Sequence, residues 1–243
     1  MLLVVASAAP PPHGPVTRDQ MVLVPAGECI VGSLDGDTDE APPRRVFLPA
    51  FYIDKFEVTH GQYSRFIAAT GHKPPIDWVN GQFSPKLSNH PVVNVTFSDA
   101  EVYAKWAGKR LPTEMEWEKA ARGSDGRSFP WGNGTTNQSA WGEFAKEHTW
   151  PVGSFTNDVS PFGAADMAGN VWEWTASWYD AYPGNQQLDL AFGKKYRVIR
   201  GGGAIEYYGK PATRRCAQRG RSVPYGTFDA LGFRCVKDVE PPK

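Results

Sequence analysis

The chain has 243 residues, with 26 acidic and 26 basic side chains, and so carries no net charge at neutral pH. Without a net charge it produces no long-range electrostatic attraction for nucleic acid or for an anionic membrane surface. We therefore expect no nucleic-acid partner. The 25 glycines, 21 prolines and 13% aromatic residues predict one large, loop-rich domain with few long helices.

The first 20 residues are not expected to belong to the fold. They begin with the apolar run MLLVVASAAP and continue into the proline-rich stretch APPPHGPVTRD, which cannot pack. The apolar run ends in an A-x-A-like ASA but lacks a basic start, so a remnant export signal and a disordered tail both stay open. An exported or periplasmic location and a cytoplasmic one therefore stay open too. The domain itself is placed at residues 21–240, where no stretch approaches the roughly 18 apolar residues of a membrane span.

Two apolar, β-branched runs open the domain, MVLVPAGECIVGS and RRVFLPAFYIDKFEVT. The acidic turn LDGDTDEAPP separates them, and the pattern predicts a strand, an exposed loop and a second strand. Cys29 falls in the first run and is expected to be a buried strand residue.

The first predicted helix follows the second apolar run. Thr59 is placed to act as its N-cap and Gly71 to end it. Tyr63, Phe66 and Ile67 recur at helical spacing and are expected to form its apolar face.

The second predicted helix is capped by Ser98, because Glu101 then stands at the third helical position and completes a capping box. With this start, the inner face carries Val102, Tyr103 and Trp106.

A third helix is predicted in LPTEMEWEKAARG. It begins at Pro112 or Thr113. Glu114 and Glu116 lie in its first turn and Arg122 in its last turn, as the helix dipole favours.

Beyond residue 123 the pattern indicates loops and short strands, with YRVIRGGGA and LGFRCVK as the clearest strand candidates. One stretch fits neither class. DMAGNVWEW, at residues 166–174, holds two carboxylates and two tryptophans, which makes it too polar for a core strand and too aromatic for a loop.

Seven segments occur in the order seen in the formylglycine-generating enzyme, or sulfatase-modifying factor, family. They are MVLVPAGECIVGS, APPRRVFLPAFYIDKFEVTHGQYSRFI, HPVVNVTFSDAEVYAKWAGKRLPTEMEWEKAARG, FPWGN, PFGAADMAGNVWEWT, YRVIRGGGA and LGFRCV. The chain resembles that family over residues 21–238. The resemblance implies a variant of the C-type lectin fold, which is a single α+β domain with little regular secondary structure.

The same resemblance accounts for DMAGNVWEW as a calcium site. The family binds a structural calcium ion through an Asn-x-x-Gly-x-Ala-x-Glu element, whose ligand positions correspond to Asp166, Gly169, Val171 and Glu173. Ca²⁺ takes six to eight hard oxygen ligands, which an acid at each end of a glycine-containing turn can supply. The alternative is that Glu173 pairs with an arginine and Asp166 caps a turn. A second family calcium site would lie near Ser139, but its Asn is replaced here and we do not carry that site over.

The family's oxidase activity depends on two cysteines five residues apart, which bind copper and oxidise a substrate cysteine to formylglycine. Soft thiolates suit both tasks, since they hold Cu(I) and exchange with a substrate sulfur. Counting along the segment before RRCAQR places the two positions at Glu206 and Pro211, and Gly203 replaces the family's serine. The resemblance therefore implies a member that binds no copper and makes no formylglycine.

Cys216 and Cys235 match two family cysteines whose disulfide partners correspond to Ala104 and Ala121. Both family disulfides are therefore absent. Two interpretations stay open for the remaining pair, namely small buried hydrophobes or one mutual disulfide.

The segment 203–225 is expected to form a ligand-binding groove. Tyrosine gives rigid amphipathic contact area and arginine gives forked donors, and both are enriched at recognition surfaces. The predicted ligand-binding residues are Trp172, which matches a tryptophan near the family's active groove, and Glu206, Tyr207, Tyr208, Arg214 and Tyr225. The alternative is that the tyrosines are loop packing and that Arg215 and Arg219 pair with Glu114 and Glu116.

The predicted function is a calcium-stabilised bacterial scaffold that binds a peptide, protein or small ligand of unknown identity. One alternative is an oxidoreductase or maturation enzyme of the same family with chemistry other than copper-thiolate oxidation. The family's iron-dependent members hold their metal on three histidines of a separate domain, and the five histidines here show no metal-ligand spacing. Another alternative is a ligand-display protein with a variable C-terminal region.

Overall fold

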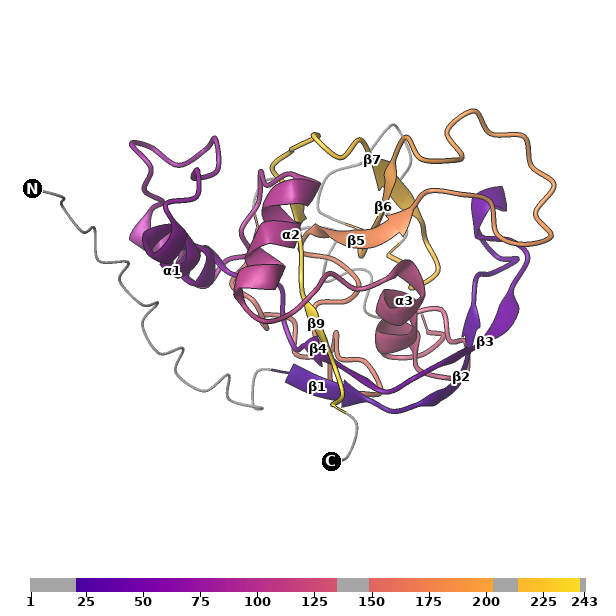
Figure 1. Ribbon diagram of the computed structural model, residues 1–243. Helices are drawn as coiled ribbons and strands as arrows, with labels where there is room; N and C mark the ends of the chain where they lie inside the picture. The colour runs from indigo at the N-terminus through magenta and orange to yellow at the C-terminus, as the bar shows by residue number, and fades with distance from the viewer. Residues whose placement is uncertain (1–20, 135–148, 203–213, 241–243) are drawn as a thin grey trace, which may run out of the picture.

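The computed structural model describes residues 21–134, 149–202 and 214–240. The described strands form three small sheets (Figure 1). One is antiparallel, in the order β1 (Met21–Val24), β4 (Phe51–Asp54), β9 (Val236–Asp238). The second pairs β2 (Gly27–Val31) with β3 (Arg44–Leu48). The third has the order β7 (Gly220–Ser222), β6 (Arg197–Arg200), β5 (Trp172–Trp178), β8 (Leu231–Gly232), and its β5–β8 pair is parallel.

The described α-helices are short: α1 (His60–Thr70), α2 (Phe97–Trp106) and α3 (Glu114–Arg122). Two 3₁₀ turns, η2 (Thr38–Glu40) and η3 (Pro85–Leu87), complete the regular structure. This mixture of small sheets and short helices confirms the predicted α+β class with little regular secondary structure. Within the described ranges, none of the helices has both the length and the apolar content needed to cross a bilayer.

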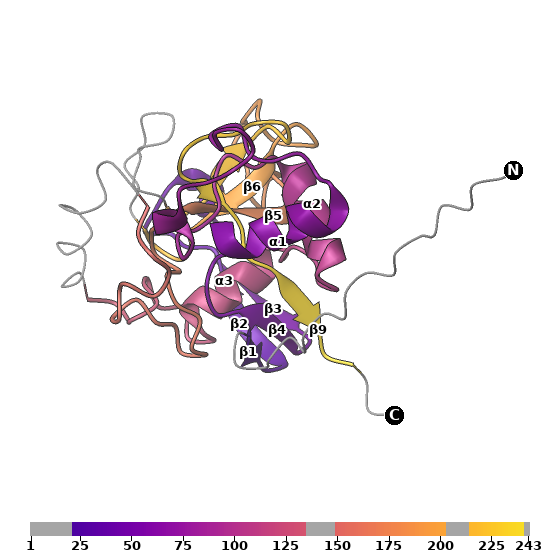
Figure 2. The same ribbon diagram turned by 90° about the vertical axis from the view of Figure 1, so that its left-hand side faces the viewer.

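Helix α3 occupies the centre of the molecule, between the four-stranded sheet and the sheet that contains β1 and β4 (Figures 1 and 2). Its Trp117 is fully buried, in a core cluster with Val24, Phe51 and Ile53. The Trp117 indole Nε1 donates to the carboxylate of Glu173 on β5, 2.8 Å away. The helix therefore joins the two sheets through both apolar packing and a polar contact.

The two apolar runs at the start of the domain form four strands, so the prediction of one strand in each run was wrong. Each run is interrupted at a proline, Pro25 in the first and Pro49 in the second. Proline lacks the N–H that a strand interior needs. The four strands nevertheless pair as the two arms of a hairpin, with β1 on β4 and β2 on β3. Cys29 lies buried on β2, as predicted.

The acidic turn between the two arms was predicted to be exposed, and this is correct for only part of it. Leu34 and Asp35 are exposed, whereas Asp39 and Glu40 in η2 are 3% and 0% exposed. Partners from distant parts of the chain cover these two carboxylates: the hydroxyl of Tyr179 and the guanidinium of Arg215.

Helix α1 confirms its predicted ends. The hydroxyl of Thr59 accepts from the N–H of Gln62, the amide of Gln62 accepts in return from the N–H of Thr59, and Gly71 adopts the left-handed conformation at the C-cap. Tyr63 and Phe66 are buried, and Ile67 packs against the same core cluster.

The predicted start of the second helix was wrong by two residues. Thr96 is the N-cap of α2, and the carboxylate of Asp99 accepts from the main-chain N–H of Thr96 at 2.9 Å. This start turns Ala100, Tyr103 and Ala104 toward the core, where all three are buried. Val102, which was predicted to face inward, is 39% exposed. In α3, Thr113 is the N-cap and Glu116 completes its capping box.

The prediction that DMAGNVWEW is too polar for a core strand was also wrong. Its last three residues begin β5, which lies inside the four-stranded sheet, and Trp172, Glu173 and Trp174 are all buried. The segment LGFRCVK, which was predicted as one strand, divides into β8 and the start of β9 in two different sheets. Arg234 lies in the bend between them.

Candidate functional site

Four buried carboxylates and one buried guanidinium lie at the junction of the sheets, and we call this group the acidic centre. Its members are Glu57 between β4 and α1, Asp158 and Asp166 in the loop before β5, Glu173 on β5 and Arg234 between β8 and β9. Each is no more than 1% exposed. The group thus draws on segments spread over most of the described chain.

Arg234 holds Glu173 in a two-pronged ion pair. Its Nε donates to Oε2 and its Nη2 to Oε1, both at 2.7 Å. The other guanidinium donors reach main-chain oxygens of Asp54, Lys55 and Asp166 at 3.1–3.3 Å. Bidentate pairs of this kind are strong and directional. The alternative prediction that Glu173 pairs with an arginine is therefore confirmed.

The turn before β5 is shaped around its two aspartates. Asp166 and Asn170 both have positive φ, at 57° and 58°, a region that asparagine and aspartate enter more readily than most residues. The carboxylate of Asp158 accepts from the N–H of Ala168 at 2.9 Å, and that of Asp166 accepts from the N–H of Gly153 at 2.6 Å. The turn is therefore closed on both sides by side-chain contacts.

The acidic centre has more negative charge than its contacts balance. If all four carboxylates were ionised, they would leave a net charge of −3 against the guanidinium of Arg234, in a buried region. Burial raises the pKa of Glu57 and Asp166, and it raises the pKa of Asp158 to about 7. Buried charges of one sign are costly unless a proton or a cation compensates them.

Several oxygens in the acidic centre are free to bind such a cation. Both side-chain oxygens of Glu57, Oδ1 of Asp158 and Oδ1 of Asp166 are buried without a hydrogen-bond partner. Glu173 accepts three hydrogen bonds, which leaves one lone pair on Oε1. Carboxylate oxygens are the ligands that calcium prefers. The residues present therefore fit calcium.

The carboxylates alone would not complete such a site. In the part of the chain that the structure describes, no three of them offer oxygens within 4.8 Å of one another. Main-chain oxygens are needed, and the predicted Gly169 and Val171 would supply them. A Cβ at Gly201 would lie 3.0 Å from the carbonyl oxygen of Val171, so glycine there leaves that oxygen uncovered.

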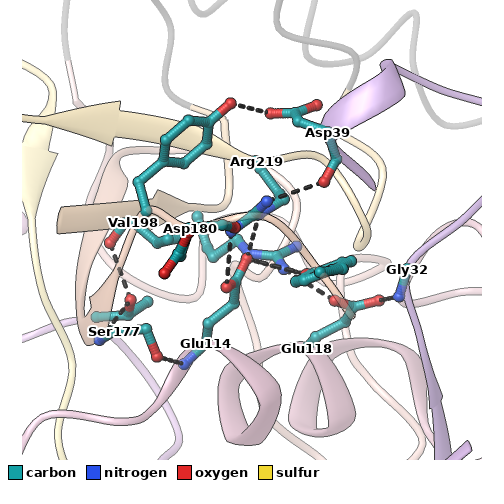
Figure 3. Close-up of polar contacts among 12 residues, drawn as sticks. Gly32, Asp39, Glu114, Glu118, Ser177, Asp180, Val198 and Arg219 are labelled. Atoms are coloured by element: carbon teal, nitrogen blue, oxygen red, sulfur yellow. Dashed lines mark hydrogen bonds and ion pairs between the residues drawn. The ribbon is translucent and has the colours of Figure 1, made fainter. Parts of the chain in front are cut away.

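A second polar network lies on the other side of α3, and Figure 3 shows how Arg219 reaches both Glu114 and the main chain of Asp39. Arg200, which is fully buried, donates to Glu114 at 2.6 Å and to Glu118 at 2.9 Å. Although burial alone would raise it, the two guanidiniums hold the pKa of Glu114 below its usual range. Arg219 thus pairs with Glu114, as one alternative predicted. Arg215 pairs instead with Glu40, at 2.6 Å.

The predicted ligand-binding residues have different environments. Glu206, Tyr207 and Tyr208, like Gly203, Pro211 and Ser139, lie outside the described residues. Trp172 is 3% exposed, with its ring edge against Gly220, so it serves as core packing here. Arg214 is half-buried at a positive φ of 58°, and Tyr225 is 79% exposed. Trp172, Arg214 and Tyr225 thus differ in exposure, and their ligand role stays a prediction.

All three cysteines of the chain are described, and all are buried free thiols. Cys29, Cys216 and Cys235 lie in three different core clusters, so the alternative of a Cys216–Cys235 disulfide was wrong. Burial raises the pKa of each thiol. A thiol with a raised pKa in an apolar site is a poor nucleophile and a poor metal ligand.

We expect the native protein to show almost no reaction with a thiol reagent such as DTNB at pH 8, because no thiol is both exposed and ionised. Unfolding in guanidinium without a reductant should release three thiols per chain. Release of one thiol would mean that the other two form a disulfide. Rapid reaction of the native protein would contradict the burial described above.

The fold and its acidic centre define a formylglycine-generating-enzyme-like domain. Residues 7–239 match the family model of the sulfatase-modifying factor enzyme 1-like domain, and the chain belongs to that family. It is 33% identical to the formylglycine-generating enzyme of Streptomyces coelicolor, over 97% of this chain and 95% of that one. It is also 36% identical to the serine/threonine-protein kinase Pkn1 of Chlamydia trachomatis, but the chain spans only 38% of that relative's length.

Solved structures have the same fold. PvdO from Pseudomonas aeruginosa superposes with a TM-score of 0.71 at 27% identity, over 90% of this chain and 94% of that one. Treponema denticola variable protein 1 gives a TM-score of 0.72 at 21% identity, over 90% and 95% of the two chains. The second likeness concerns the fold alone.

Proposed function

We propose that this chain is a formylglycine-generating-enzyme-like protein without formylglycine-generating activity. It acts as a calcium-stabilised scaffold that binds a peptide, protein or small ligand through the segment 203–225. Three features support this proposal: the positions of the cysteines, the unpartnered oxygens of the acidic centre and the composition of the segment.

The positions of the cysteines carry the proposal. Copper-dependent oxidation in this family depends on two neighbouring thiolates, and soft sulfur is what retains Cu(I). The three thiols of this chain lie apart in separate clusters, each no more than 1% exposed. Glu206 and Pro211 stand where the thiolates would be. A carboxylate and a side chain without donor atoms cannot replace them.

Calcium is the cofactor that the acidic centre supports. Asp166, Gly169, Val171 and Glu173 match the family's ligand positions, and Glu57 adds a buried carboxylate with two unpartnered oxygens. With all four carboxylates ionised, a divalent cation would change the net charge of the acidic centre from −3 to −1. Its role would be structural, because it would join the turn before β5 to the strand itself.

The described residues just before the segment and in its second half are firmly held, which suits a support for binding residues. Before the segment, Arg200 is fully buried at the end of β6. Within its second half, Arg215, Arg219 and Arg221 pair with Glu40, Glu114 and Asp189 respectively, at 2.6–2.9 Å. Recognition residues are commonly carried by loops on a rigid scaffold.

The described histidines favour the scaffold over an enzyme with altered metal chemistry. Nδ1 of His60 accepts from the indole of Trp78 at 3.0 Å, Nε2 of His72 pairs with Asp99 at 2.8 Å, and Nδ1 of His90 contacts Thr149 at 3.0 Å. Within the described residues, none of the three histidines belongs to a group of three or more candidate metal ligands. We accordingly do not propose a metal centre built from these three.

The binding proposal is tested with a Tyr207→Ala/Tyr208→Ala double variant in a pull-down from the native host. The variant should lose one specific partner that the wild type captures, because it removes two aromatic contact surfaces from the segment. The matched control is Leu188→Ala/Leu190→Ala, which removes two fully exposed apolar side chains elsewhere and should retain that partner. A partner retained by the tyrosine variant, or lost by both variants, would contradict the proposed site.

A further inference from the structure

A second group of acidic side chains lies in the loop between β2 and β3. The sequence DGDTDE places Asp35, Asp37 and Asp39 at alternate positions, with Glu40 directly after them. Asp37, Asp39 and Glu40 each offer a carboxylate oxygen, and these three oxygens lie within 4.8 Å of one another. We call these three residues the loop cluster.

Two members of the loop cluster carry unpartnered oxygens inside the protein. Asp39 and Glu40 are 3% and 0% exposed, and Oδ1 of Asp39 and Oε2 of Glu40 are buried without a hydrogen-bond partner. Their other oxygens are engaged, since Tyr179 donates its hydroxyl to Asp39 Oδ2 at 2.6 Å and Arg215 donates to Glu40 Oε1 at 2.6 Å. One oxygen of each residue is thus oriented by a partner while the other is left to bind something else.

The charges around the two buried members, Asp39 and Glu40, favour a cation. Arg215 balances the charge of Glu40. Arg219 donates to the main-chain oxygen of Asp39, but its charge is already opposed by Glu114, as Figure 3 shows. Buried carboxylate oxygens that are neither paired nor hydrogen-bonded are costly, and a bound metal ion removes that cost.

We propose that Asp37, Asp39 and Glu40 bind a calcium ion at a site separate from the acidic centre. Calcium binds oxygens at about 2.3–2.6 Å, so two ligands of one ion are at most about 5 Å apart, and this spacing agrees with the loop cluster. The ligands are hard carboxylate oxygens, and water or main-chain oxygens fill the remaining coordination positions.

The ion would join three parts of the fold. The hydroxyl of Thr38 donates to Gln187 at 2.6 Å, and the amide of Asn185 donates to the main-chain oxygens of Thr38 and Ala41 at 2.8 and 2.7 Å. Arg215 connects the same loop to the described part of the segment 203–225. Calcium in the loop cluster therefore stabilises that part of the segment.

The test is calcium binding by the full chain, stripped with EGTA, dialysed and titrated by isothermal calorimetry. Wild type is expected to bind two ions, and the Asp39→Asn and Asp166→Asn variants are expected to bind one each.

The Asp39→Asn side chain keeps an oxygen that can accept from the Tyr179 hydroxyl, and near-ultraviolet circular dichroism checks that the variant folds. Asp37→Asn, at a half-buried position, provides the same test if Asp39→Asn does not fold. Asp35→Asn removes the same charge from the same loop but not from the loop cluster, and it should bind two ions.

The outcomes separate this proposal from the calcium site of the acidic centre. A single wild-type ion that persists in Asp37→Asn and Asp39→Asn and disappears in Asp166→Asn would overturn the loop-cluster site alone. A single wild-type ion that disappears in Asp37→Asn and Asp39→Asn and persists in Asp166→Asn would support the loop-cluster site and contradict the calcium site of the acidic centre. No calcium binding by the wild type would overturn both.

Discussion

Replacing Arg234 with glutamine is expected to lower the free energy of unfolding by about 3–5 kcal/mol, because breaking a buried ion pair leaves its partner charge uncompensated. Arg234 and Glu173 are both fully buried and share two hydrogen bonds of 2.7 Å. The variant would also remove a positive charge that favours the ionised forms of Glu57, Asp158 and Asp166. Urea unfolding in calcium-containing buffer, followed by tryptophan fluorescence, measures the change.

Arg45→Gln is the matched control for this experiment. Arg45 pairs with Glu28 at 3.7 Å, but the two side chains are 72% and 63% exposed, so the loss should be below about 1 kcal/mol. Equal losses in the two variants would show that burial does not decide the effect. A loss below about 1 kcal/mol in Arg234→Gln would contradict the expected cost of leaving the buried Glu173 carboxylate without its guanidinium.

Calcium removal is expected to have the second largest effect. An ion that binds only the folded state, at a free concentration 100-fold above its Kd, stabilises it by about 2.7 kcal/mol. For a domain of this size about 1 kcal/mol moves the Tm by about 2–4 °C, so EGTA should lower the Tm by roughly 5–10 °C. An Asp39→Asn background removes the contribution of the loop cluster, and differential scanning fluorimetry gives the Tm.

Two variants in that background assign the EGTA response to the acidic centre. Asp166→Asn should melt at a lower temperature than its parent and should no longer respond to EGTA. Asp125→Asn, which removes an exposed carboxylate paired with Arg127, should respond as its parent does. If EGTA leaves the Tm of the parent unchanged, Asp166, Gly169, Val171 and Glu173 do not hold calcium.

Local sequence rules located the helix ends where a single rule applied. Thr59 and Gly71 were the one pair that could begin and end α1. The start of α2 was ambiguous, because Thr96 with Asp99 and Ser98 with Glu101 both have the spacing of a capping box. Tertiary contacts decide between them: the N–H of Phe97 donates to the carbonyl of Pro224 at 3.0 Å, and Asp99 also pairs with His72.

Charge in the core could not be predicted from local pattern. From the sequence alone, Glu173 made β5 look too polar for a buried strand. Its partner Arg234 lies 61 residues later, and this ion pair allows Glu173 to be buried. The turn that holds Asp39 and Glu40 was likewise predicted to be exposed. The partners that cover these two carboxylates, Tyr179 and Arg215, lie 140 and 175 residues away in the sequence. The alternate acids of DGDTDE are the pattern from which the proposed cation site could have been predicted.

Aldehyde formation is the measurement that tests the central claim most directly. A CxPxR-type peptide is incubated with the purified protein, copper, oxygen and reductant, and mass spectrometry and an aldehyde-reactive probe detect the product. The Streptomyces coelicolor formylglycine-generating enzyme is the positive control. We expect no aldehyde above the level of the enzyme-free reaction, because this chain has no pair of neighbouring thiolates. Conversion of the peptide to formylglycine by this chain would contradict the account.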